Sequence, residues 1–202
     1  MDNLNTENKI LKAAEDEFVE RGFDGARMQA IAEKAGINKA LLHYYFRSKQ
    51  KLFEVVFKTV IKLLLPKLFK VFEDNSLDFN EKLRRFIDSY ITMIMKNPHI
   101  PVFIIHELST NKTSSLKAAF AELNLDLSPI KNLITQEVEK GNIRDIKPEH
   151  LIINIIALCV FPVAASPIGT QILFDGDKKA YGNFLKERKQ QVADFVINSI
   201  KL

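Results

Sequence analysis

The chain has 202 residues, 47% of them hydrophobic, and a formal net charge of only +4. That length suits a small domain followed by a larger one with a filled core, and the single cysteine, Cys159, excludes an internal disulfide framework. A lone cysteine fits a reducing cytosol, and the N-terminus MDNLNTENK lacks the charged start and apolar run of a signal peptide, so we expect a cytoplasmic protein.

The first predicted helix is amphipathic. Its apolar residues Ile10, Leu11, Ala14 and Phe18 recur at helical spacing, and the helix is expected to end at Arg21-Gly22-Phe23.

Two short helices joined by a tight turn are predicted next. The first covers about residues 28–35, and Gly36 after it is the residue that most easily adopts the left-handed conformation that ends a helix. Asn38 is a good N-cap for the following helix, KALLHYYF. Two helices joined by a turn that contains glycine form a helix-turn-helix, which places its second helix in the DNA major groove.

The charge is distributed unevenly around this motif. Residues 26–51 hold six Lys or Arg and one acid, a net of +5, whereas residues 1–25 hold three basic and seven acidic residues, a net of −4. A local basic patch of this kind is typical of phosphate binding, although a solvated charge run is the alternative.

The order of these features, over about residues 5–60, resembles the N-terminal domain of the TetR family of bacterial transcriptional regulators. The turn Ala35-Gly36-Ile37, the helix end His43-Tyr44-Tyr45-Phe46 and the segment Arg47-Ser48-Lys49 carry the resemblance. It implies an all-α protein with a three-helix helix-turn-helix DNA-binding domain in residues 1–48. A helical effector-binding and dimerisation domain in residues 49–202 would follow. It also implies a ligand-responsive regulator, most simply a repressor, that is not an enzyme.

The resemblance places His43 and Tyr44 where side chains grip the DNA backbone, and Lys49 where an ammonium and helix N-terminal amides meet a phosphate. Gln29 and Lys39 are expected to read adenine and guanine, with Asn38 and Leu41 as further readers. For each of these four residues, the alternative interpretation is an ordinary surface residue without a DNA contact. Ser48 is expected to cap the following helix, either with or without a direct contact to DNA. The full predicted DNA-contact set is Arg27, Gln29, Asn38, Lys39, Leu41, His43, Tyr44, Ser48 and Lys49.

Two positions depart from the family pattern. Ala26 and Arg27 stand where the family commonly has a Thr that caps the next helix and touches a phosphate. Arg27 is expected to replace the phosphate contact with a charged one, whereas neither residue replaces the capping hydroxyl. His43 replaces a more frequent Tyr, and an imidazolium there would make DNA affinity rise as pH falls.

Helix is expected for nearly all of the remaining chain. The predicted helices cover residues 49–72 with a kink or break at Pro66, 79–96, 101–109, 114–123, 128–141 with Ser128 as N-cap, 148–166 and 178–201. The last is expected to bury Phe184, Val192, Phe195, Val196 and Ile200. The apolar run 151–163 is too short for a membrane span of about 20 residues, so we interpret it as a helix buried on more than one side.

The resemblance implies a homodimer in which helices 148–166 and 178–201 pair with their mates across a two-fold axis. Two recognition helices are needed to read a palindromic operator with half-sites about 34 Å apart, or a multiple of that.

The family also implies a small-molecule effector pocket in the C-terminal domain. Tyr90, Met93, Met95, Phe103, His106, Cys159 and Phe161 are its candidate lining residues, with ordinary core packing as the alternative for each. Such a lining would favour a hydrophobic or aromatic effector. No cofactor, metal or catalytic motif is expected, because the four histidines are scattered and no glycine-rich phosphate loop is present.

A helical membrane-surface or partner-binding protein is the alternative function. Lysines 58, 62, 67 and 70 alternate with apolar residues in the basic amphipathic stretch 58–72. We interpret this stretch as the helix that follows the DNA-binding domain, and we expect no membrane binding.

Overall fold

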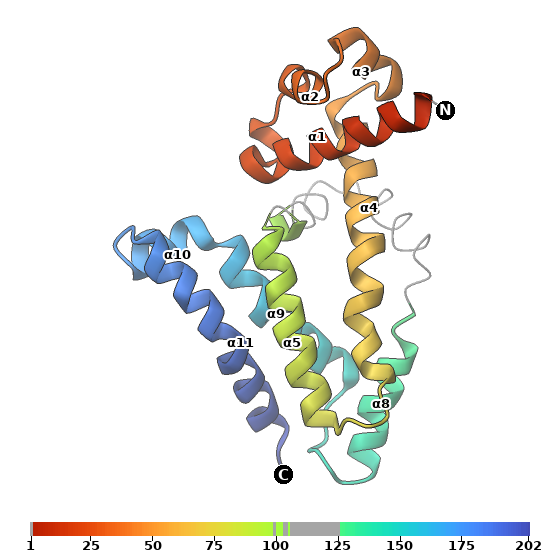
Figure 1. Ribbon diagram of the computed structural model, residues 1–202. Coiled ribbons are helices and arrows are strands. Elements are labelled where there is room, and N and C mark those ends of the chain that lie inside the picture. The colour runs from red at the N-terminus through yellow and green to blue at the C-terminus, as the bar shows by residue number, and fades with distance from the viewer. Residues whose placement is uncertain (1, 99, 103–104, 106–125) are drawn as a thin grey trace. The chain divides into compact units, whose positions relative to one another are not determined.

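The computed structural model describes residues 2–98, 100–102, 105 and 126–202, and every regular element in these ranges is a helix (Figure 1). The expected all-α class is therefore confirmed. The chain divides into two compact units, one with residues 1–63 and 102–123 and the other with residues 64–101 and 124–202. We call them the N-terminal and C-terminal units and describe each by itself. The predicted functional boundary between residues 48 and 49 remains a prediction, because compactness does not measure which residues bind DNA or effector.

The N-terminal unit contains α1 (Asp2–Gly25), α2 (Met28–Lys34), α3 (Lys39–Tyr45) and the start of α4 (Lys49–Phe69). Gly22 interrupts α1 with φ 66°, close to the helix end predicted from the sequence. The aromatic centre of the core is an edge-to-face pair between Phe18 and Phe53, whose ring centroids are 4.6 Å apart. Other fully buried side chains around it are Ile10, Ala14, Ile31, Ala32, Leu42 and Leu52.

The turn between α2 and α3 has the predicted form. Gly36 has φ 70°, and the amide of Ile37 after it donates to Ala32 O at 3.0 Å, which closes the C-terminus of α2. The Asn38 side chain accepts from the amide of Leu41 at 2.7 Å and so caps α3. At the other end of α2, Arg27 occupies the N-cap position without a side-chain hydrogen bond, as expected where Thr is absent.

The C-terminal unit contains the end of α4 followed by η1 (Lys70–Glu73), α5 (Phe79–Lys96), α8 (Ser128–Glu139), α9 (Pro148–Ala164), α10 (Ser166–Leu173) and α11 (Lys178–Ile200). In Figure 1, α5 and α11 lie side by side, and both contact α9. Their facing sides form one apolar core. Its most deeply buried members are Leu83, Ile87, Ile91, Ile94, Ile134, Leu151, Cys159, Val192 and Ile200.

Four details of the sequence-based prediction require correction. The helix does not break at Pro66 but continues to Phe69, because a proline removes a single helical hydrogen bond and Leu68 beyond it is buried in the core. Ser128 lies inside α8 rather than at its cap, since Asp126 accepts from the Ser128 amide at 2.8 Å. The third is α10, which was not predicted. The fourth is Phe195, which is 64% exposed rather than buried. The helices predicted at 101–109 and 114–123 fall almost wholly outside the described residues.

α9 and α10 meet at a bend of 72° that two side chains of α11 support. Pro162 has no N–H to donate, which leaves the carbonyl of Leu158 without its helical partner. An Nη atom of Arg188 donates to that carbonyl at 3.2 Å, and the hydroxyl of Tyr181 donates to Pro162 O at 2.6 Å. The two α11 residues are seven positions apart and therefore lie on one face of the helix.

The described residues include two helices, α9 and α10, with strongly apolar composition. No single helix in the described ranges has the length and apolar composition of a membrane span, whereas α9 and α10 taken as a bent pair reach that threshold together.

Candidate DNA-binding surface and effector region

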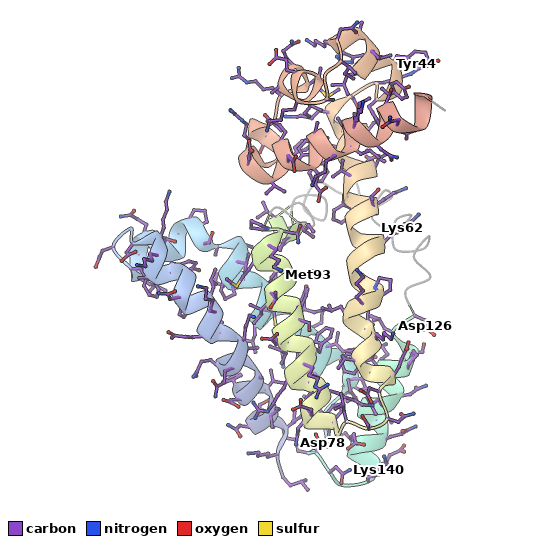
Figure 2. All side chains as sticks on the ribbon, viewed as in Figure 1. Tyr44, Lys62, Asp78, Met93, Asp126 and Lys140 are labelled. Carbon is purple, nitrogen blue, oxygen red and sulfur yellow. The ribbon has the colours of Figure 1, made fainter. Side chains whose placement is uncertain are left out.

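α3 separates its side chains sharply between core and surface. Leu42 is completely buried, and Phe46, just beyond the helix, is also in the core. The residues around Leu42 face outward, including His43, and Tyr44 is 78% exposed (Figure 2). The predicted readers Lys39 and Leu41 are exposed on the same helix. Buried apolar side chains therefore hold α3 against the core, while a tyrosine and a lysine are exposed on its outer side. This is the form of a recognition helix.

One of the six basic residues in 26–51 is neutralised by α1. The Nζ atom of Lys34 lies 2.8 Å from carboxylate oxygens of both Glu17 and Glu20. Glu17 is 1% exposed and also lies 3.2 Å from Arg21, and the Lys34 ammonium beside it lowers the pKa of this carboxyl. Lys34 therefore joins α1 to α2 and contributes little charge to the surface.

A second basic residue is engaged inside the N-terminal unit. Lys49, the first residue of α4, donates from Nζ to the carbonyls of Asp24 and Ala26, each at 3.2 Å. The same ammonium lies 4.7 Å from the centroid of the Phe23 ring. Carbonyls at the end of a helix lack helical partners, so Lys49 satisfies those at the end of α1. Sequence reasoning assigned Lys49 to a phosphate and missed this contact, since nothing in the local pattern brings residues 24 and 49 together.

The other basic residues of the segment lie on the surface. Arg27, Lys39, Arg47 and Lys51 are exposed, and none of them forms an ion pair with a carboxylate in the part of the chain that the structure describes. They are therefore the charges that remain for phosphate contacts.

Three predicted contact residues also make local hydrogen bonds. Gln29 donates to the Glu33 carboxylate at 2.8 Å, which leaves its amide oxygen unused. Asn38 uses its side-chain oxygen to cap α3. Ser48 accepts from the amide of Lys51 at 3.1 Å and caps α4, so its capping role is observed.

The candidate effector residues lie partly in the core of the C-terminal unit. Tyr90 and Met93 project from α5 and Cys159 from α9, and Figure 2 marks the place of Met93 on α5. Burial raises the pKa of the Cys159 thiol to about 12, and burial also raises the pKa of Tyr90. Met95 is half-buried against the same core.

Of the remaining members of that predicted set, the structure describes only Phe161. Phe161 is 71% exposed on a side of α9 that the rest of the described chain does not cover, so it does not line an interior pocket of the C-terminal unit. Phe103 and His106 lie outside the described residues. The described residues contain no group of three or more His, Cys, Asp or Glu side chains that could hold a metal ion.

Sequence reasoning did not single out Arg188. It lies on α11 between the Leu158 carbonyl and the Phe184 ring, whose centroid is 6.0 Å from the guanidinium carbon. The only signal in the sequence is its spacing of seven residues from Tyr181, which is too common in helices to identify a site.

Comparison with known proteins connects these features to a family. Residues 10–56 match the model of bacterial regulatory proteins of the tetR family. The transcriptional regulator RutR of Escherichia coli is 29% identical over 148 residues, which cover 73% of this chain and 69% of RutR. The transcriptional repressor NicS of Pseudomonas putida is 30% identical over 162 residues, with coverage of 77% and 74%. The crystal structure of HlyIIR, a hemolysin II transcriptional regulator, superposes with a TM-score of 0.60 at 27% identity and covers 85% of this chain and 94% of its own. With a helix-turn-helix at the matched residues and relatives similar along most of their length, this chain belongs to the TetR family of bacterial transcriptional regulators and is not an enzyme.

Proposed function

We propose that the protein is a homodimeric repressor that binds a palindromic operator and leaves it when a small hydrophobic effector binds. The observation that carries the DNA-binding half of this proposal is the division of α3, in which Leu42 is buried while Tyr44 beside it is 78% exposed. Such a helix presents its outer side chains to a groove without disturbing the core that holds it.

The exposed residues take different roles in this proposal. Lys39, Leu41 and Gln29 read bases, whereas Tyr44 and His43 donate to phosphate oxygens, and Arg27 adds a charged contact at the start of α2. Asn38 and Ser48 contribute mainly as caps. We assign Lys49 the task of holding α4 against the end of α1, in place of the phosphate contact expected from the sequence.

An exposed apolar surface supports dimerisation through α9 and α11. Large hydrophobic side chains are more than 60% exposed on both helices and on α10, and exposed apolar surface of this kind favours a protein partner. They are Ile153 and Phe161 on α9, Ile168, Ile172 and Leu173 on α10, and Phe195 on α11. A second copy of the chain is the partner that would also double the number of recognition helices.

The effector is proposed to bind in the C-terminal unit near Tyr90, Met93 and Cys159, whose apolar surroundings suit a hydrophobic molecule. The protein is proposed to act in the cytoplasm, where the operator DNA is found.

Selection of bound sequences from a random duplex library at physiological salt tests the proposal. Enrichment of a palindrome is expected, and its half-site spacing should correspond to one helical turn of about 34 Å or a multiple. Enrichment of a single half-site would refute the dimeric reading of the operator. No enrichment, with binding that vanishes as salt rises, would refute sequence-specific recognition altogether.

The alternative of a membrane-surface protein that uses residues 58–72 gains no support from the described residues, and the relatives above are transcriptional regulators. Flotation with anionic vesicles separates the two functions. Robust vesicle binding together with a failure to bind any duplex would favour the alternative.

A further inference from the structure

Arg188 on α11 is a charged residue without a carboxylate partner among the described residues. Two other basic residues of the C-terminal unit do have such partners, because Lys189 lies 3.2 Å from Asp88 and Arg84 lies 2.6 Å from Asp194. The guanidinium donates from one Nη atom to the Leu158 carbonyl, which occupies one of its five N–H groups.

The Nε atom of Arg188 is buried and has no hydrogen-bond acceptor among the residues that the structure describes. Burying a hydrogen-bond donor without an acceptor costs free energy, and the cost is larger when the donor belongs to a charged group. Buried donors without partners are therefore rare in native proteins, and each one calls for an explanation. The Leu158 carbonyl accounts for part of the guanidinium but leaves the Nε–H unexplained.

The surroundings of the guanidinium are apolar and aromatic. Phe184 lies beside it, and the Phe184 ring packs at a tilt against the rings of Tyr181 and Phe174, with centroid distances of 5.5 and 5.3 Å. The positive charge of Arg188 acts to lower the pKa of the Cys159 thiol, although burial outweighs it, and Cys159 in turn affects Tyr90. The Leu158 carbonyl that Arg188 contacts belongs to the residue before Cys159, so Arg188 lies near one of the residues already proposed for the effector site.

We propose that Arg188 binds the carboxylate of an acidic effector whose apolar part lies among Tyr90, Cys159 and the aromatic side chains of α11. The planar guanidinium matches a carboxylate in geometry, and the acid would supply the charge and the acceptor that Arg188 lacks. This inference rests on the proposed function, in which a small ligand controls DNA binding, and it narrows that ligand from a hydrophobic molecule to an amphiphilic acid.

Matched acids and alcohols test the inference. Benzoate and decanoate are titrated into the full-length protein by calorimetry, each beside its neutral counterpart, benzyl alcohol or decan-1-ol. We expect at least one acid to bind tenfold or more tightly than its alcohol, and Arg188→Met to abolish that preference. Equal binding of acid and alcohol, binding of neither acid, or an acid preference that survives in Arg188→Met would each overturn the inference.

Two further variants control for charge and for folding. Lys186→Met removes an exposed positive charge from the same helix and should leave the acid preference intact. Loss of the preference in Lys186→Met would show that net charge alone attracts the acids and would also overturn the inference. Arg188→Lys keeps a charge and a donor for Leu158 O but lacks the planar fork, so it should fold normally and still bind acids at least tenfold more weakly.

DNA release is measured separately on the selected operator. If acids bind through Arg188 but leave the operator complex intact, the inference stands and ligand-controlled repression fails. If the alcohols release the operator as well as the acids do, ligand control stands and the acidic effector is refuted.

Discussion

Replacement of Lys49 by methionine distinguishes a positioning role from a phosphate contact. The substitution keeps most of the aliphatic stem but removes the ammonium. The two hydrogen bonds of the ammonium to the carbonyls of Asp24 and Ala26 are lost, and so is its contact with the Phe23 ring. Charge-assisted bonds of this kind are partly screened here because Lys49 is only half-buried. We therefore expect the free energy of unfolding to fall by about 1–3 kcal/mol, measured by urea denaturation.

The salt dependence of DNA binding supplies the decisive measurement. Each neutralised phosphate contributes about −0.9 to the slope of log K against log salt, so a phosphate contact by Lys49 in both protomers would contribute about −1.8. We expect Lys49→Met to weaken operator binding at every salt concentration while the slope changes by less than about 0.5.

Arg27→Met is the control, because Arg27 is exposed and makes no ion pair with a described carboxylate. Its slope should become less negative while its stability is unchanged. The positioning role would be refuted if Lys49→Met made the slope of log K against log salt less negative by about 1.8 and left the urea midpoint unchanged.

Four other outcomes are expected. Since Lys34 holds the folded-state pKa of Glu17 below its ordinary value, the stability that Glu17 contributes is present above the unfolded-state pKa of about 4.5 and is lost as pH falls through the lower folded-state value. Urea denaturation of wild type and Glu17→Gln should therefore differ at pH 7 and converge in acid, and a constant difference would contradict this origin. Tyr181→Phe removes the hydrogen bond to the α9 bend and should cost about 1 kcal/mol in the same assay, whereas an unchanged urea midpoint would show that the bond adds nothing. Phe195→Glu should convert a dimer to monomer in light scattering, and a persistent dimer would exclude this face of α11. With a pKa of about 12, only about one Cys159 thiol in 10,000 is ionised at pH 8, so iodoacetamide should label the native protein far more slowly than the urea-unfolded chain.

The helix-turn-helix could be predicted from sequence because each of its parts is specified locally. Gly36 takes the positive φ that a tight turn needs, Asn38 supplies its own oxygen to the amide three residues on, and Leu42 and Phe46 repeat at helical spacing. The bounds of α5 were predicted correctly for the same reason, since Asp78 caps the helix and its apolar residues follow the helical period.

The spacing of apolar residues does not show which other element covers a given face of a helix. Most errors of the sequence-based prediction concern such faces. Phe195 and Phe161 were expected to be buried because large aromatic residues usually are, yet both lie on sides of their helices that the subunit leaves uncovered. The short helix α10 begins at Ser166, where the preceding helix was predicted to end, and its proline lies in the first turn, where proline is well tolerated.

The sequence by itself determined the helical class, the helix-turn-helix and the family, because caps, turns and apolar spacing act between residues a few positions apart. Only the tertiary structure decided what each charge does. Lys49 meets carbonyls more than 20 residues earlier in the chain, and Arg188 meets one 30 residues earlier. The groups that accept from Lys49 and Arg188 are backbone carbonyls, which every residue possesses. No pattern of side chains in the sequence could therefore have predicted these contacts.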